Sequence, residues 1–152
     1  MLKELLKKFL PWVIVFGGAA LIVILALGKI TSIDPNTVTI KYIEDAATYK
    51  KSSTGGYTKV VSSSEKNVIK QWMELYKDAT PKDRQTDLNA YSAAYPCYIV
   101  EFREGSNVVA WIQITTKEVA FGQRLKQTKY VGYAPKNPFY DIASKLMAEI
   151  EK

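Results

Sequence analysis

Few residues of this chain are able to do chemistry, because histidine is absent and cysteine occurs once. Without histidine the chain cannot form a Ser–His–Asp triad or a Cys–His pair, and it lacks a common zinc ligand. Cys97 has no second cysteine for an intrachain disulfide, and its place at the start of an apolar run favours a buried packing residue. We therefore predict no metal and no cofactor.

Carboxylates are the remaining candidates for catalysis. Glu101 lies in an expected strand, and Asp83 and Asp87 lie in a long polar connection. Two carboxylates about 5–10 Å apart can cleave a glycosidic bond, so a carboxylate-dependent hydrolase of cell-wall glycans is the enzymatic alternative. The sequence places no pair at that distance, no phosphate-binding glycine loop occurs, and no small-molecule substrate is identified.

Basic and aromatic residues alternate late in the chain, at Arg124, Lys126, Lys129, Tyr130 and Tyr133. Such a run can hold an anionic polymer by charge and stacking, although it is also typical of a solvated strand. Trp111 joins these candidates as a large aromatic residue on the solvent side of an expected strand. The alternative interpretation is that the loop after Asp78 partly covers Trp111.

One apolar stretch decides where these residues lie relative to a membrane. Leu10–Leu27 carries no charge, and residues 10–30 together reach the roughly 30 Å of a hydrocarbon core. Basic residues precede the stretch, whereas roughly balanced charges follow it, so we expect the N-terminus in the cytoplasm and the rest outside. The residues expected at the membrane interface are Lys3, Lys7, Lys8 and Trp12.

The predicted organisation has four parts. They are a cytoplasmic amphipathic tip (1–9), a transmembrane signal anchor (10–30), a stalk (31–36) and an extracytoplasmic domain (37–152). The alternative is a signal peptide cleaved after Gly28, since Ala26 and Gly28 are small residues at the positions that a signal peptidase reads. The length of the apolar run favours the anchor, and both alternatives export the domain.

The exported part predicts an α+β fold. Alternating apolar residues predict strands at 37–43, 57–61, 97–103, 108–115, 119–123 and 129–133. Apolar residues at helical spacing predict one helix after Glu65 and a final helix starting at Pro138, with Asn137 as its cap. Tight turns imply an antiparallel sheet of about five or six strands, and one-sided helices imply that both helices cover one face in a two-layer domain.

Three segments carry a resemblance to a known group of proteins. They are the helix 67–76 (NVIKQWMELY), the hairpin 98–114 and the turn 132–135 before the last helix. Together they resemble the small extracytoplasmic domains of uncharacterised function on anchored proteins and lipoproteins of Gram-positive bacteria. The chain departs from these in lacking a lipid-modified cysteine. The resemblance implies an envelope location and brings no catalytic residues.

These observations favour a bitopic protein of the cell membrane whose exported domain is a non-enzymatic interaction module. Without Lys3, Lys7, Lys8 and Glu4 of the tip, the 21 basic and 15 acidic residues of the chain become 18 and 14, so the exported part carries about +4, which favours association with anionic lipid headgroups or wall polymers. The expected partners are membrane lipid and either another envelope protein or an anionic wall polymer, and the domain could be one subunit of a membrane complex. Export argues against nucleic acid.

Overall fold

The computed structural model describes residues 33–50, 56–87, 94–124 and 126–151, and Asp34–Lys152 form one compact unit. The predicted tip, the predicted span 10–30 and the interface residues Lys3, Lys7, Lys8 and Trp12 lie outside the described residues. None of the helices within the described ranges has both the length and the apolar character that crossing a membrane requires.

An antiparallel sheet forms the body of the unit, in the order β2-β1-β4-β5-β6-β7-β3. The strands are β1 (Thr37–Ile43), β2 (Lys59–Ser63), β3 (Thr86–Asp87), β4 (Cys97–Glu104), β5 (Asn107–Thr115), β6 (Glu118–Gln123) and β7 (Lys129–Gly132). The predicted antiparallel sheet is confirmed. Its six longer strands match the predicted ones closely, whereas the sequence does not predict β3, because two residues are too few to show alternation.

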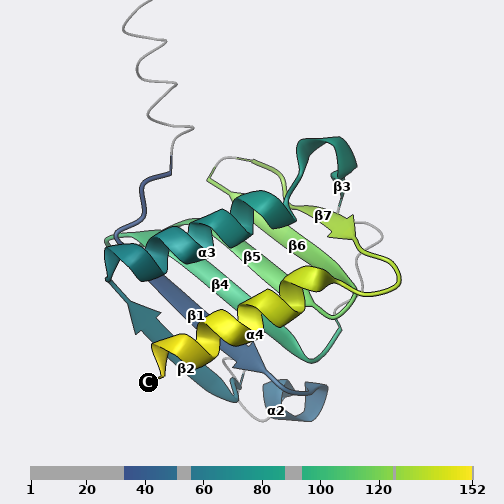
Figure 1. Cartoon of the computed structure of the whole chain (residues 1–152), viewed down its shortest axis with the longest axis horizontal. Helices are drawn as coiled ribbons and strands as arrows, with labels where there is room; N and C mark the ends of the chain where they lie inside the picture. Colours follow the sequence, from purple (N-terminus) through teal and green to yellow (C-terminus); the bar gives the residue numbers. More distant parts are fainter. Residues whose placement is uncertain (1–32, 51–55, 88–93, 125, 152) are drawn as a thin grey trace, which may run out of the picture. The chain divides into compact units, whose positions relative to one another are not determined.

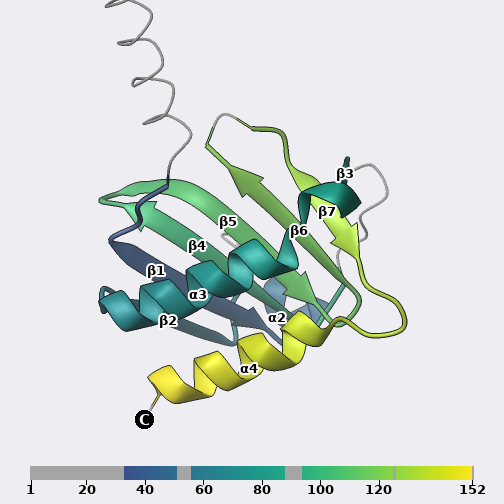
Figure 2. The same cartoon turned by 45° about the horizontal axis from the view of Figure 1, so that its top comes forward.

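Helices α3 (Lys66–Ala79) and α4 (Pro138–Ile150) both lie across one face of the sheet, as Figures 1 and 2 show. Two further short elements interrupt the connections, α2 (Ala46–Lys50) and the 3₁₀ turn η1 (Lys82–Arg84). The predicted α+β class is therefore confirmed for the described residues. The sequence does not predict α2, since five residues are too short for a helical period to be recognised.

The core lies between the sheet and the two long helices. Trp72 of α3 is 1% exposed, and fully buried residues alternate along the central strands. The alternating positions are Val38 and Ile40 in β1, Val100 and Phe102 in β4, and Ile112 and Ile114 in β5. Burying an apolar side chain of this size stabilises the fold by roughly 1.5–3 kcal/mol, so this layer dominates stability.

A bulge changes the expected alternation at the start of β5. Phe102 pairs with Ala110 but Arg103 pairs with Val108, so β5 holds one extra residue at this point. Val109 is consequently buried, whereas Val108 is 41% exposed although the sequence alternation places it inside. The correction affects only the end of the hairpin, because the pairing from Ala110 onward keeps the predicted register.

The residues just before β1 form hydrogen bonds with the turn between β4 and β5. The Asn36 amide donates to the Arg103 carbonyl at 2.9 Å, and the Asn36 side-chain oxygen accepts from the Gly105 amide at 3.2 Å. Gly105 has a φ of 61°, a conformation that glycine adopts without steric cost. Residues 34–36 of the predicted stalk are thus attached to the domain.

The final helix begins at a buried polar cap. The Asn137 side chain is fully buried; its oxygen accepts from the Phe139 amide at 3.0 Å, and its nitrogen donates to the Thr115 carbonyl at 2.9 Å. The predicted cap is confirmed. In addition, the same side chain joins α4 to the turn between β5 and β6, which the sequence does not reveal.

Replacing Asn137 with alanine should lower the free energy of unfolding by about 1–3 kcal/mol, because the part-buried Phe139 amide and the buried Thr115 carbonyl each lose a partner. Urea unfolding of the variant tests this. Asn67→Ala, at an exposed position of α3, is the matched control and should change stability by less than about 0.5 kcal/mol. Equal stability of the two variants would contradict the structural role of Asn137.

Candidate functional site

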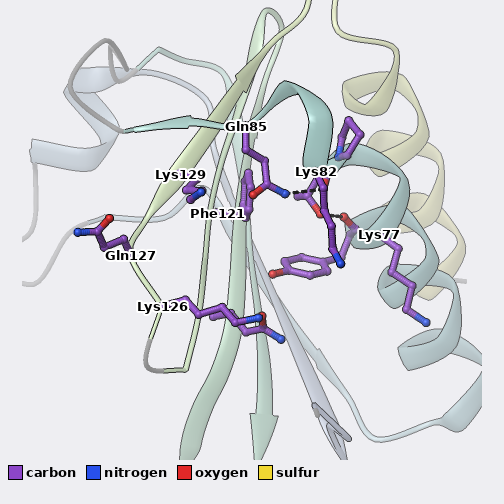
Figure 3. A pocket seen from close by; sticks show the side chains of 11 residues that line it. Lys77, Lys82, Gln85, Phe121, Lys126, Gln127 and Lys129 are labelled. Carbon is purple, nitrogen blue, oxygen red and sulfur yellow. Dashed lines mark hydrogen bonds between the residues drawn. The ribbon is translucent and has the colours of Figure 1, made fainter. Parts of the chain in front are cut away.

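A cleft of about 830 Å³ opens at the end of α3, beside β6 and β7 (Figure 3). One wall consists of the last turn of α3 and η1, and the other consists of β6, β7 and the turn between them. A cleft of this volume accommodates a ligand of drug-like size or a segment of a polymer. Its lining residues are Tyr76, Lys77, Thr80, Pro81, Lys82, Gln85, Phe121, Gln123, Lys126, Gln127 and Lys129.

The floor of the cleft is apolar because of the pairing of the outer strands. Phe121 pairs with Ile112 on one side and with Lys129 on the other, so all three lie on the face that carries the helices. Tyr76 meets Phe121 edge to face, with ring centroids 6.4 Å apart, and both side chains are 8% exposed. Lys129 therefore extends from β7 beside a buried aromatic pair.

The walls of the cleft are positively charged. Four of its lining residues are lysines, and none of its lining residues in the described part of the chain is an aspartate or a glutamate. Lys126 donates to the Gln123 side chain at 2.7 Å, whereas the described residues contain no ion pair that involves Lys77, Lys82 or Lys129. In Figure 3, Lys82 comes from the helical wall and Lys126 and Lys129 come from the strand wall.

The C-terminal end of a helix normally repels anions through its free carbonyl groups. Here three carbonyls near the end of α3 accept hydrogen bonds: that of Tyr76 from Thr80 at 2.7 Å, that of Ala79 from Tyr133 at 2.8 Å, and that of Thr80 from Gln85 at 3.1 Å. Burial raises the pKa of the Tyr76 hydroxyl to about 12, so it stays neutral near pH 7. The charge of the cleft is therefore determined by its lysines.

Only part of the sequence-predicted basic patch belongs to this cleft. Lys126 and Lys129 line it, and they are joined by Lys77 and Lys82 from segments more than forty residues earlier. The sequence gives no spacing signal that links the two pairs. A lysine in the last turn of a predicted helix is also the ordinary complement of the helix dipole, so Lys77 could not be singled out.

Two other residues of the predicted patch have structural roles. Arg124 forms an ion pair with Glu104, with 3.2 Å between Nη2 and Oε2, outside the cleft. Tyr133 donates to the Ala79 carbonyl, and its ring packs against Phe139 with centroids 5.3 Å apart. Tyr133 thereby links the end of α3 to the start of α4 and is not available as a stacking surface.

The remaining aromatic candidates lie on the opposite face of the sheet. Trp111 pairs with Glu101 and Gly122, and Tyr130 pairs with Ala120, all with side chains directed away from α3 and α4. The indole of Trp111 covers Gly122, since a Cβ atom added there would overlap the ring. The sheet therefore separates Trp111 and Tyr130 from the cleft, and the predicted patch is not one surface.

Glu101 belongs to a compensated charge cluster on that opposite face. Its carboxylate is paired with Lys41 through Oε1 and with Arg103 at 2.5 Å through Oε2. Burial by itself raises the pKa of the Glu101 carboxyl, but hydrogen bonds from Lys41 and Arg103 outweigh burial and leave this pKa below its ordinary value. A general acid needs the opposite shift, so Glu101 is poorly suited to protonate a leaving group.

The other two carboxylates considered for hydrolysis lie in different elements from Glu101. Asp83 is exposed in η1, and Asp87 pairs with Lys129 in β3 at the far edge of the sheet. Among the described residues, no group of histidine, cysteine, aspartate and glutamate side chains is arranged to hold a metal ion.

Comparison with models of protein families, with curated proteins and with solved structures finds no match to this chain.

Replacing Glu101 with glutamine should lower the free energy of unfolding by about 1–3 kcal/mol near pH 7, because two partly buried cations lose their anion. A carboxyl whose pKa is lowered on folding stabilises the protein above its unfolded pKa of about 4.3, and this contribution is lost as the pH falls through the folded pKa. The difference between wild type and variant in urea unfolding should therefore shrink below about pH 4.

The matched control is Glu74→Gln, whose carboxylate is exposed and lies 4.0 Å from Lys70. It should change stability by less than about 0.5 kcal/mol at every pH. A difference for Glu101→Gln that stayed constant from neutral to strongly acidic pH would contradict the assigned ion pairs.

Proposed function

We propose that this chain is a single-pass protein of the cell envelope whose domain outside the membrane binds an anionic polymer in the lysine-lined cleft. The observation that carries the proposal is the charge of the cleft, since the lining residues that the structure describes include four lysines and no carboxylate. The alternative expected from sequence, binding to another envelope protein, would require that protein to present an acidic segment to the same cleft.

Concave placement makes these charges more effective than lysines scattered on a surface. The apolar floor formed by Tyr76 and Phe121 lowers the local dielectric constant, and the lysines act together on whatever enters. A polymer with a charge in each unit can contact several ammonium groups at once, whereas a single small anion cannot. The glutamine side chains of the lining can donate to or accept from the uncharged polar groups of such a chain.

The proposed role is non-enzymatic. Among the residues that the structure describes, the lining contains no carboxylate, cysteine or histidine, the groups that most often act as general base or nucleophile. Glu101, the strand carboxylate considered for catalysis, is paired with two cations on the sheet face opposite the helices. The features of the cleft therefore favour binding over bond cleavage.

The envelope location rests on the N-terminal sequence. The apolar stretch 10–30, the lysines that precede it and the resemblance to anchored extracytoplasmic domains all support export of the domain. An exported domain meets wall polymers and lipid headgroups rather than nucleic acid. The proposal thus combines a location argued from sequence with a ligand class argued from the cleft.

A double variant, Lys82→Gln with Lys126→Gln, should bind a polygalacturonate or polyphosphate chain about tenfold more weakly than wild type. The two removed cations should also lower the slope of log Kd against log salt concentration by about 2. Fluorescence titration of the full chain in detergent, at several salt concentrations, measures both.

The matched control, Lys66→Gln with Lys145→Gln, removes the same charge from exposed positions of α3 and α4 outside the cleft. It should keep most of the affinity. Equal weakening by both pairs would show that net charge, and not the cleft, binds the polymer, and the proposal would fail.

Protease added to intact cells should digest the domain after residue 33 and leave the N-terminal segment protected. This follows from an anchor whose lysine-rich end is cytoplasmic. Immunoblotting with a tag at the C-terminus measures the loss, and a cytoplasmic protein serves as the control for leakage. A domain that resists digestion until the cells are lysed would contradict the orientation.

A further inference from the structure

One long edge of the sheet has no neighbour among the described strands. β2 ends the strand order on one side, and Figure 1 shows it at the margin of the sheet. At the other margin, β7 is partly covered by the two-residue strand β3. An edge strand presents a row of backbone N–H and C=O groups that can pair with another strand.

β2 is short, with five residues, but it lacks proline and bulges, two of the features that block such pairing. It contains no proline, and its register with β1 runs without a shift from Val38 opposite Ser63 to Tyr42 opposite Lys59. Val60, its second residue, is 52% exposed, the most exposed of the large apolar side chains in the described residues. An uninterrupted strand with an exposed valine is a template for a further strand.

The single charge of β2 is already neutralised within the domain. Lys59 lies opposite Tyr42, on the face of the helices, and forms an ion pair with Glu151 just after α4. Val60 and Ser62 face the other side, where the Ser62 hydroxyl lies 2.9 Å from that of Thr39. Because Glu151 neutralises Lys59, this lysine does not repel a strand that pairs with the edge.

We propose that β2 pairs antiparallel with β2 of a second copy of this chain, so that one sheet continues across a two-fold axis. Antiparallel pairing of identical strands puts the two Lys59 residues at opposite ends of the contact, and no like charges meet. In the register centred on Val61, Val60 lies opposite Ser62 of the second copy, and the two Val60 side chains are diagonal neighbours on the same face of the joined sheet. A parallel arrangement would instead bring the two lysines together.

The self-complementary pattern is the reason for choosing a second copy over a different protein. In a two-fold contact centred on Val61, Lys59 meets Ser63, Val60 meets Ser62 and only Val61 meets its own counterpart, so the strand pairs with itself without opposing like charges. The contact involves five residues on each side, so we expect a weak dimer whose population depends on concentration. This inference does not depend on the ligand of the cleft.

The test compares Val60→Lys with Val108→Lys in the full chain in detergent. Both variants convert an exposed valine to lysine, but Val108 lies at the turn between β4 and β5. In sedimentation velocity over a concentration series, wild type and Val108→Lys should dimerise. Val60→Lys should need about tenfold higher concentration, because it sets cations against the paired edge.

Hydrogen exchange of wild type provides a second measurement that needs no variant. Amides of residues 59–63 should exchange more slowly as the protein concentration rises, while those of β7 should not change. If circular dichroism shows that Val60→Lys is unfolded, Ser62→Lys on the same face of β2 replaces it.

Three results would overturn the inference. They are a wild type that is monomeric at every concentration, a Val60→Lys variant that dimerises as readily as Val108→Lys, and exchange in β2 that is independent of concentration. The second result would place any dimer contact elsewhere, for example in the N-terminal segment.

Discussion

The rest of the structure depends on the burial of one sheet face beneath α3 and α4. Because side chains alternate along a strand, covering one face determines the direction of every residue in the sheet once the register is set. Val100, Phe102 and Ile112 must lie under the helices, so Glu101 and Trp111 must lie on the other side. The same alternation carries outward through β6 to β7 and decides which outer residues can meet.

The cleft is the part of this covered face that the helices do not reach. α3 ends at Ala79, next to β6 and β7, and the aromatic floor of Tyr76 and Phe121 continues the core to the opening. No ion pair among the described residues involves Lys77, Lys82 or Lys129. On the other face, the carboxylate of Glu101 is neutralised by ion pairs with Lys41 and Arg103. The compensated cluster stabilises the fold, whereas the lysine-lined cleft is the proposed binding site.

The two proposals use opposite margins of the sheet. The cleft lies beside β7, and the proposed dimer contact lies at β2, five strands away in the sheet order. A two-fold contact through β2 would therefore leave both clefts accessible. Two sites on one assembly would bind a long polymer more tightly than either site alone, since the second contact becomes intramolecular. Dimerisation and polymer binding would then support each other without any change in the cleft itself.

Sequence by itself determined the local elements of the domain. Alternation in 37–43 and 97–103, helical spacing in the two long helices and the Asn137–Pro138 start of α4 depend on neighbouring residues, and all are found in the structure. The short elements α2 and β3 escaped prediction because they contain too few residues to show a period. The extra residue at Val109 escaped it because a bulge follows from how β4 and β5 pair.

Only the tertiary structure decided which residues share a site. Five residues of the predicted patch are near one another in sequence, yet the fold separates them. Arg124 forms an ion pair, Lys126 and Lys129 line the cleft, Tyr130 lies on the opposite face, and Tyr133 contacts a helix. Lys77 and Lys82 come to the cleft from a distant segment. The physical reason is that neighbours along a strand point to opposite faces, whereas residues far apart in sequence are brought together by strand pairing and helix packing.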